Sequence, residues 1–238
     1  MRHAPALPRL LSFDLDGTLV DTAGAITTAV NETMAHFGLP PQAEADVRNL
    51  IGDGSRALML QLLAQACLQQ PALADRLDAD AVLEHFEGRL RITLTTLARP
   101  YPGVSDALAR LQSSGLLLAC VSNKEAALAR RVLEATGLAP LFVLLVGGDT
   151  LPQKKPHASV LRHVLDTLKC RSDEAAHVGD SGTDVAAARN AGLRAWAVPY
   201  GYNHGRPIAD TRPDELFDDI AQLADRLLGS VRAAPAPL

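Results

Sequence analysis

Four short polar segments carry the side chains of this sequence that could do chemistry. They are Asp14-Leu15-Asp16-Gly17-Thr18, Ser122-Asn123-Lys124, Lys154-Lys155 and Gly179-Asp180 with Asp184 four residues further on. Each segment comes after a short apolar run, which is typical of residues at the carboxyl end of a buried strand. Because the carboxyl ends of parallel strands meet at one edge of a sheet, we expect the four segments to face a single crevice.

Acidic side chains dominate this expected crevice. Four carboxylates at one place would repel one another unless a cation lay among them. The seven histidines show no paired ligand spacing, so we expect surface or helix-capping positions for them. Oxygen ligands without histidine or cysteine favour a hard ion that keeps part of its water, and the sequence therefore predicts a Mg²⁺ site.

The elements that would position these segments alternate between apolar runs and helical patterns. We expect strands at residues 10–15, 116–121, 142–146, 175–178 and 194–198. Helices are expected at residues 104–112, 125–135, 159–168, 185–190 and about 214–228. Repeated strand–helix alternation predicts an α/β fold, a doubly wound parallel sheet with helices on both faces.

The stretch between the first strand and the Pro-rich segment at residues 99–103 has a different texture. Ile26, Val30 and Met34 fall at helical spacing, and similar apolar patterns recur around Leu58 and Phe86. No strand pattern lies between residues 22 and 96. We therefore expect a small all-helical domain at residues 21–100, inserted into a discontinuous core made of residues 1–20 and 101–238.

In this order and spacing the four segments resemble the four motifs of the haloacid dehalogenase (HAD) superfamily of aspartate-nucleophile phosphatases. The insertion is similar to the helical cap that many members carry. Such caps open and close over the site, so the resemblance implies hinges near residues 20–22 and 99–102. Within the superfamily, the sequence most resembles the bacterial phosphoglycolate phosphatases. The segments that carry this resemblance are residues 147–152, Lys155-Pro156 and residues 200–203. The resemblance implies a HAD-type Rossmann-like core under a helical cap domain.

The resemblance also implies a role for each residue of the crevice. Asp14 would be the nucleophile that carries an aspartyl-phosphate, and Asp16 the general acid and base. Mg²⁺ would be held by Asp14, the backbone carbonyl of Asp16, and Asp180, while Asp184 would orient metal-bound water or Lys155. The phosphoryl oxygens would be bound by Thr18, Ser122, Asn123 and Lys155. Lys155 is preferred to Lys154 because the family lysine directly precedes a proline.

Recognition of a small acidic substrate needs donors for its carboxylate as well as for its phosphate. The best candidates in the insertion are Arg48, Gly52, Gly54 and Arg56, since the glycines let backbone N–H groups approach a ligand. The alternative is that both arginines lie on a solvated face. The sequence leaves these two interpretations open.

The resemblance implies a Mg²⁺-dependent phosphomonoester hydrolase that converts 2-phosphoglycolate to glycolate and phosphate. Alternatives are a phosphatase for another small phosphomonoester, such as a sugar phosphate or nucleotide monophosphate, and a phosphomutase of the β-phosphoglucomutase type. Thr18 favours hydrolysis, because related mutases tend to carry valine there, and Asp16 argues against a dehalogenase. A non-catalytic binding module is disfavoured by the complete set of motif residues.

Composition excludes several other classes. The 238 residues carry a formal net charge of -4, which gives no global reason to bind nucleic acid or an anionic membrane. No apolar run approaches the roughly 20 residues needed to span a bilayer. The three cysteines are far apart and form no CxxC pair. We expect a cytoplasmic monomer or homodimer whose partner is a small phosphomonoester.

Overall fold

The computed structural model describes residues 7–232, and its centre is a six-stranded sheet in the order β5-β4-β1-β6-β7-β8. All five neighbouring pairs run parallel. The strands are β1 (Leu10–Phe13), β4 (Leu117–Val121), β5 (Leu144–Val146), β6 (Ala175–Gly179), β7 (Arg194–Ala197) and β8 (Glu215–Leu216). Strand β1 lies between β4 and β6, so the chain reverses its winding direction there, and the carboxyl ends of these three strands lie side by side.

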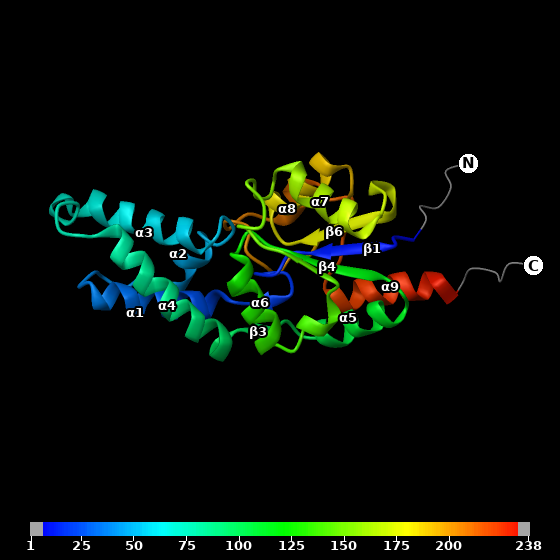
Figure 1. Cartoon of the computed structure of the whole chain (residues 1–238), viewed down its shortest axis with the longest axis horizontal. Coiled ribbons are helices and arrows are strands. Elements are labelled where there is room, and N and C mark those ends of the chain that lie inside the picture. Colours follow the sequence, from blue (N-terminus) through cyan, green and yellow to red (C-terminus); the bar gives the residue numbers. More distant parts are fainter. Residues whose placement is uncertain (1–6, 233–238) are drawn as a thin grey trace, which may run out of the picture.

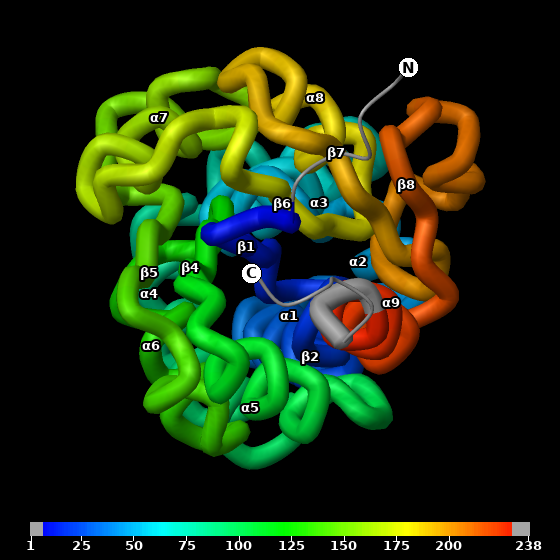
Figure 2. Tube along the Cα trace, turned by 90° about the vertical axis from the view of Figure 1, so that its right-hand side faces the viewer, coloured from blue at the N-terminus to red at the C-terminus, as the bar shows by residue number. Residues whose placement is uncertain are grey.

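Helices cover both faces of this sheet (Figure 2), with α7 and α8 on one face and α5, α6 and α9 on the other. Their bounds are α5 (Val104–Ser113), α6 (Ala126–Ala135), α7 (Ala158–Leu168), α8 (Gly182–Ala191) and α9 (Ile220–Arg232). Successive residues of β1 point to opposite faces: Leu10 packs in the cluster beneath α7 and α8, and Leu11 in the cluster on the other face. Both faces are buried, which confirms the predicted doubly wound α/β sheet.

Four helices lie between the first strand of the sheet and α5, gathered at one end of the molecule (Figure 1). They are α1 (Ala23–His36), α2 (Glu44–Arg48), α3 (Ser55–Gln69) and α4 (Ala79–Leu97), and we call them the helical insertion. The apolar residues at helical spacing, such as Val30 and Phe86, are fully buried among these helices. Four single-turn 3₁₀ helices complete the described chain: residues 71–73, 139–141, 172–174 and 208–211.

A two-stranded antiparallel ribbon joins the insertion to the sheet. Strands β2 (Val20–Asp21) and β3 (Arg99–Pro100) pair Val20 with Pro100 and Asp21 with Arg99. The ribbon occupies both segments that are expected to be hinges. Entry to and exit from the insertion are therefore tied together.

Two expected helix starts are wrong by three residues or more, and the expected strands 10–15 and 142–146 are each two residues too long. The last helix begins at Ile220 and not near Asp214, because Glu215 and Leu216 pair with β7 as the edge strand β8. Helix α8 begins at Gly182, three residues before the expected start, because Ser181 caps it by accepting a hydrogen bond from the Asp184 N–H. Among residues 7–232, no helix combines the length and apolarity needed to cross a membrane.

Candidate active site

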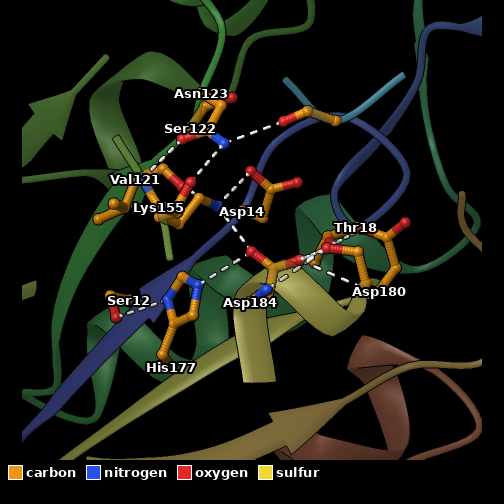
Figure 3. A network of polar contacts seen from close by, with 12 residues as sticks. Ser12, Asp14, Thr18, Val121, Ser122, Asn123, Lys155, His177, Asp180 and Asp184 are labelled. Atoms are coloured by element: carbon orange, nitrogen blue, oxygen red, sulfur yellow. Dashed lines mark hydrogen bonds and ion pairs between the residues drawn. The ribbon is translucent and has the colours of Figure 1, made fainter. Parts of the chain in front are cut away.

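The carboxyl ends of β1, β4 and β6 bring the predicted polar segments together (Figure 3). Asp14 follows β1, and its backbone N–H donates to the Val178 carbonyl of β6 at 2.9 Å. Ser122 follows β4, and its N–H donates to the Val146 carbonyl of β5 at 2.9 Å. These backbone bonds extend the sheet by one residue at each strand end, so the side chains start from rigid positions. Gly17 has φ of +86°, a backbone conformation that favours glycine and allows the tight turn after Asp16.

Lys155 is the buried cation of this cluster. Its ammonium group donates to Asp14 Oδ1, Asp184 Oδ1 and the Val121 carbonyl, each at 2.7 Å. Burial lowers the pKa of Lys155, but the two carboxylates outweigh burial and the pKa lies above its usual value. The neighbouring Lys154 is exposed and donates to the Asp53 carbonyl at 3.3 Å. The structure thus distinguishes the two lysines as the sequence interpretation does.

One ammonium group does not balance the acids around it. Asp14, Asp180 and Asp184 are all buried, and each offers a carboxylate oxygen within 4.8 Å of the others. Burial and the charges of Asp184 and Asp16 raise the pKa of Asp14 to about 7, despite Lys155. Burial, Asp14 and Asp184 likewise raise the pKa of Asp180 well above its usual value. The cluster is short of positive charge, and its all-oxygen donor set fits a hard divalent cation.

The three acids differ in how many hydrogen bonds their carboxylate oxygens accept. Asp184 accepts from Lys155 and His177 on Oδ1 and from the Ser181 side chain on Oδ2 at 2.6 Å. Burial alone would raise its pKa, but Lys155 and His177 hold the pKa of Asp184 well below the usual range. Asp14 Oδ2, in contrast, has no hydrogen-bond donor within residues 7–232. Asp14 also lines a cavity that lies between this cluster and the helical insertion. Asp180 accepts one hydrogen bond on each oxygen, from Thr18 and from the Tyr202 N–H, whereas Asp184 accepts two on each. Asp14 and Asp180 therefore keep more room for a cation than Asp184.

His177 stands behind Asp184. It is 1% exposed on β6, its Nε2 lies 3.2 Å from Asp184 Oδ1, and its Nδ1 lies 2.9 Å from the Ser12 hydroxyl. Burial lowers the pKa of His177, so we assign a neutral ring that donates from Nε2 and accepts at Nδ1. The expectation of a surface or capping position is wrong for this residue. Both faces of β6 are covered by helices, so a polar side chain within the strand is buried with its neighbours.

Asp16 lies beside the cluster with partners of its own. The Thr22 hydroxyl donates to Asp16 Oδ1 at 2.6 Å, and Lys124 Nζ lies 3.1 Å from the same oxygen. Lys124 is 4% exposed. It is a second buried lysine that the sequence interpretation left without a role, although it directly follows Ser122-Asn123. Asp16 is thus turned toward the junction with the helical insertion.

Thr18 and Asn123, which are both expected to bind phosphate, have side-chain hydrogen-bond partners within the protein. The single hydroxyl proton of Thr18 goes to Asp180 Oδ1 at 2.6 Å, and Thr18 is fully buried outside the cavity lining. The Asn123 amide donates to the carbonyls of Gly52 and Lys155, both at 3.0 Å, and accepts from the Lys155 N–H at 2.9 Å. Thr18 therefore orients Asp180, and the Asn123 side chain joins the Lys155 loop to the insertion.

A cavity of about 40 Å³ lies between this cluster and the insertion. Its lining includes Asp14, Asp16, Ser122, Lys155 and Asp180 from the core, and Ile26, Ile51, Gly52, Gly54 and Leu58 from the insertion. The rim is closed by contacts between the two parts. Ser55 Oγ donates to Glu125 Oε2 at 2.7 Å, and the Asn49 carbonyl lies 2.7 Å from His204 Nδ1.

The four predicted residues of the insertion separate into two pairs. Gly52 and Gly54 line the cavity, as expected. Arg48 does not line it but lies over the Tyr202 ring, with its guanidinium carbon 4.8 Å from the ring centroid. Arg56 is exposed on the far side of α3 and pairs with Asp80 at 3.3 Å. In this structure Arg56 does not contact the cavity, which favours the solvated-face interpretation.

We expect the substitution Arg56→Ala to change the KM of any substrate by less than twofold. An exposed ion pair contributes between about 0 and 1 kcal/mol to stability, and this one makes no contact with the cavity. Steady-state kinetics of the two proteins would check this. A large rise in KM for acidic substrates alone would contradict the position of Arg56.

Comparisons with known proteins agree with this geometry. The chain matches the haloacid dehalogenase-like hydrolase family over residues 11–198. It is 38% identical to a phosphoglycolate phosphatase of Vibrio vulnificus, over 93% of this chain and 97% of that protein. It is 39% identical to phosphoglycolate phosphatase 1 of Pseudomonas aeruginosa, over 92% of this chain and 80% of that protein.

A solved structure, a predicted phosphoglycolate phosphatase from Haemophilus somnus, is 31% identical with a TM-score of 0.84, covering 95% of this chain and 100% of that one. The family match runs from β1 to just beyond β7 and contains every residue of the acidic cluster and both buried lysines. Sheet order, strand-end carboxylates and sequence similarity lead to one conclusion: the chain belongs to the haloacid dehalogenase-like hydrolase family.

Proposed function

We propose that the protein is a Mg²⁺-dependent phosphomonoester hydrolase that acts on 2-phosphoglycolate through an aspartyl-phosphate on Asp14. The observation that carries the proposal is the buried contact of Asp14 with Lys155 at 2.7 Å, in a cavity that also presents Asp16 and Asp180. The relatives named phosphoglycolate phosphatase, alike over most of both chains, support the choice of substrate.

Each residue of the site has a separate role in the proposed hydrolysis. Asp14 Oδ2, free of hydrogen-bond donors among the described residues, attacks phosphorus, while the Lys155 ammonium group neutralises the other oxygen of Asp14 and the transferring phosphoryl oxygens. Ser122, at the tip of β4, contacts the same phosphoryl group. Asp16 protonates the leaving alkoxide and then takes the proton from the water that attacks the aspartyl-phosphate. Thr22 and Lys124 orient the Asp16 carboxylate for both steps.

Asp14, Asp180 and the backbone carbonyl of Asp16 form the proposed Mg²⁺ site. The bound cation would supply the positive charge that allows an anionic carboxylate and an anionic phosphate to approach each other. Asp184, saturated by Lys155, His177 and Ser181, holds Lys155 in place and does not bind the metal directly. Thr18 fixes the orientation of Asp180.

We further propose that residues 21–100 form a cap domain that opens for substrate, with the remaining residues as the core; the outermost residues 1–6 and 233–238 of that core lie outside the described chain. A cavity of about 40 Å³ is far smaller than a typical ligand pocket of about 300 Å³ or more. A phosphomonoester therefore enters when the contacts of Gly52 and Ser55 with the core are released, by rotation at the β2–β3 ribbon. The three free thiols fit a reducing compartment, which supports action in the cytoplasm.

Phosphate release from a panel of phosphomonoesters, with and without Mg²⁺, tests the proposal. The panel holds 2-phosphoglycolate, sugar phosphates and nucleotide monophosphates. We expect Mg²⁺-dependent release with the highest kcat/KM for 2-phosphoglycolate. A preference for another ester would support the proposed hydrolysis but overturn the assignment of 2-phosphoglycolate as substrate. Phosphate transfer to a sugar without net release would show that the protein is a mutase.

Mg²⁺ affinity should depend on pH. Asp14 has a pKa of about 7 in the metal-free protein and must be ionised to bind a cation, so protons compete with Mg²⁺ below that pH. The dissociation constant should rise at least about tenfold for each pH unit below 7, because Asp180, whose pKa is also raised, must ionise as well. Calorimetric titration at pH 6, 7 and 8 measures this. A dissociation constant that is the same at pH 6 and pH 8 would contradict the raised pKa.

A further inference from the structure

All three tyrosines of the chain gather at the junction of core and insertion. Tyr101 directly follows β3, and its backbone N–H donates to the Leu19 carbonyl at 3.0 Å. Tyr200 lies 4.4 Å from Tyr101 between ring centroids and donates its hydroxyl proton to the Thr18 carbonyl at 2.8 Å. Tyr202 is 3% exposed and lines the cavity. Of the three, Tyr202 contacts both the insertion and the acidic cluster.

The hydroxyl of Tyr202 caps helix α1. Its oxygen accepts from the backbone N–H groups of Thr22 at 2.9 Å and Ala23 at 3.0 Å, and its proton goes to Asp21 Oδ1 at 2.5 Å. Thr22 is the N-cap residue, yet its own side chain makes no capping bond because its hydroxyl is bonded to Asp16. The Ala23 N–H also donates to Asp21 Oδ1, at the longer distance of 3.3 Å, so a residue of the core loop supplies the shorter capping bonds of this turn.

The backbone of the same residue holds Asp180. The Tyr202 N–H donates to Asp180 Oδ2, and the loop around it leaves no spare room. A Cβ atom at Gly201 would lie 2.1 Å from Asp180 Oδ2, and one at Gly17 would lie 2.9 Å from the Tyr202 ring. The Arg48 guanidinium lies over the same ring. A shift of Tyr202 would therefore move a hydrogen-bond donor of Asp180.

From these contacts we propose that Tyr202 is a positioning residue that anchors its loop to the N-terminus of α1 and thereby fixes Asp180 for metal binding. The inference rests on the proposed Mg²⁺ site and adds a residue to it from outside the four polar segments. It connects the base of the insertion with the acidic cluster through a single side chain.

The substitution Tyr202→Phe tests the inference, because it removes the hydroxyl and keeps the ring beneath Arg48. We expect the Mg²⁺ dissociation constant, measured by calorimetric titration, to rise about tenfold, as for other groups that orient a metal ligand. Amide hydrogen exchange should quicken in the first turn of α1. Saturating Mg²⁺ should restore kcat, since the variant leaves every reacting group in place.

The matched control is Asp78→Ala. Asp78 is exposed and caps α4 of the insertion through the N–H groups of Asp80 and Ala81, so this variant loses an N-cap of the insertion away from the cavity. Its Mg²⁺ affinity should equal that of the wild type. If Tyr202→Phe proves unstable, Asp21→Asn removes the charge that accepts the Tyr202 proton and should weaken Mg²⁺ binding in the same direction by a smaller factor.

The outcomes separate this inference from the proposed function. Equal Mg²⁺ affinities for the wild type and Tyr202→Phe, with phosphate release intact, would overturn the role of Tyr202 and leave the function standing. If Asp78→Ala weakened Mg²⁺ binding equally, the role of Tyr202 would also be overturned, because the loss of any helix cap in the insertion would then lower the affinity. A wild-type protein that binds no Mg²⁺ would overturn both proposals.

Discussion

The substitution Asp14→Asn should lower the rate of phosphate release by more than about 10⁴-fold, because losing a nucleophile removes the covalent route altogether. The amide cannot attack phosphorus, yet its oxygen can still accept the hydrogen bond from Lys155. The substitution also removes a buried negative charge that destabilises the cluster. Burial and the charges of Asp184 and Asp16 raise the pKa of Asp14 to about 7, which shows that its charged form is disfavoured. We therefore expect the metal-free variant to be at least as stable as the wild type.

Two measurements check this prediction together. Phosphate release under single-turnover conditions gives the rate, and thermal unfolding in the presence of a chelator gives the stability. An inactive variant with an unchanged or higher Tm is the expected result. Activity within tenfold of the wild type would remove Asp14 from the role of nucleophile.

The substitution Lys155→Met should destabilise the protein by about 3–5 kcal/mol, as the loss of one partner from a buried ion pair usually does. Methionine matches the length of the lysine stem but leaves Asp14, Asp184 and the Val121 carbonyl without their common donor. Phosphate release should fall as well, because no ammonium group remains to contact the phosphoryl oxygens.

Lys154→Met is the matched control, since the two lysines are adjacent and only Lys155 is buried. Its unfolding free energy should differ from that of the wild type by no more than about 0.5 kcal/mol. Urea denaturation of the three proteins makes the comparison. Equal losses of stability in both variants would contradict the central position of Lys155.

The positions of Asp14, Ser122 and Asp180 could be predicted from the sequence because each follows a short apolar run. A buried parallel strand has few alternatives for such a run, and the order of strands and helices then brings the strand ends together. The choice of Lys155 over Lys154 comes from the family resemblance, in which the lysine directly precedes a proline. Local sequence thus predicts the polar residues at the strand ends, and the resemblance adds the lysine.

The parts of the site that depend on how elements face one another could not be predicted. Ser55 and Arg56 are neighbours on α3, but one turns toward Glu125 and the other toward Asp80. Helical spacing indicates which residues share a face and not which face meets the core. The burial of His177 follows from helices packed on both sides of β6, and the α1 cap from Tyr202 joins residues 180 positions apart. Neither contact leaves a local signal in the sequence.

The aspartyl-phosphate on Asp14 is the intermediate on which the proposed function depends. Rapid acid quenching during turnover of 2-phosphoglycolate with Mg²⁺ tests most directly whether it forms. Peptide mass spectrometry then locates any phosphoryl group that is bound to the protein. We predict one phosphoryl group on Asp14 of the wild type and none on the Asp14→Asn variant. Phosphate release by the wild type with no phosphoryl group on Asp14, or with one on a different residue, would contradict the proposed function of this cluster.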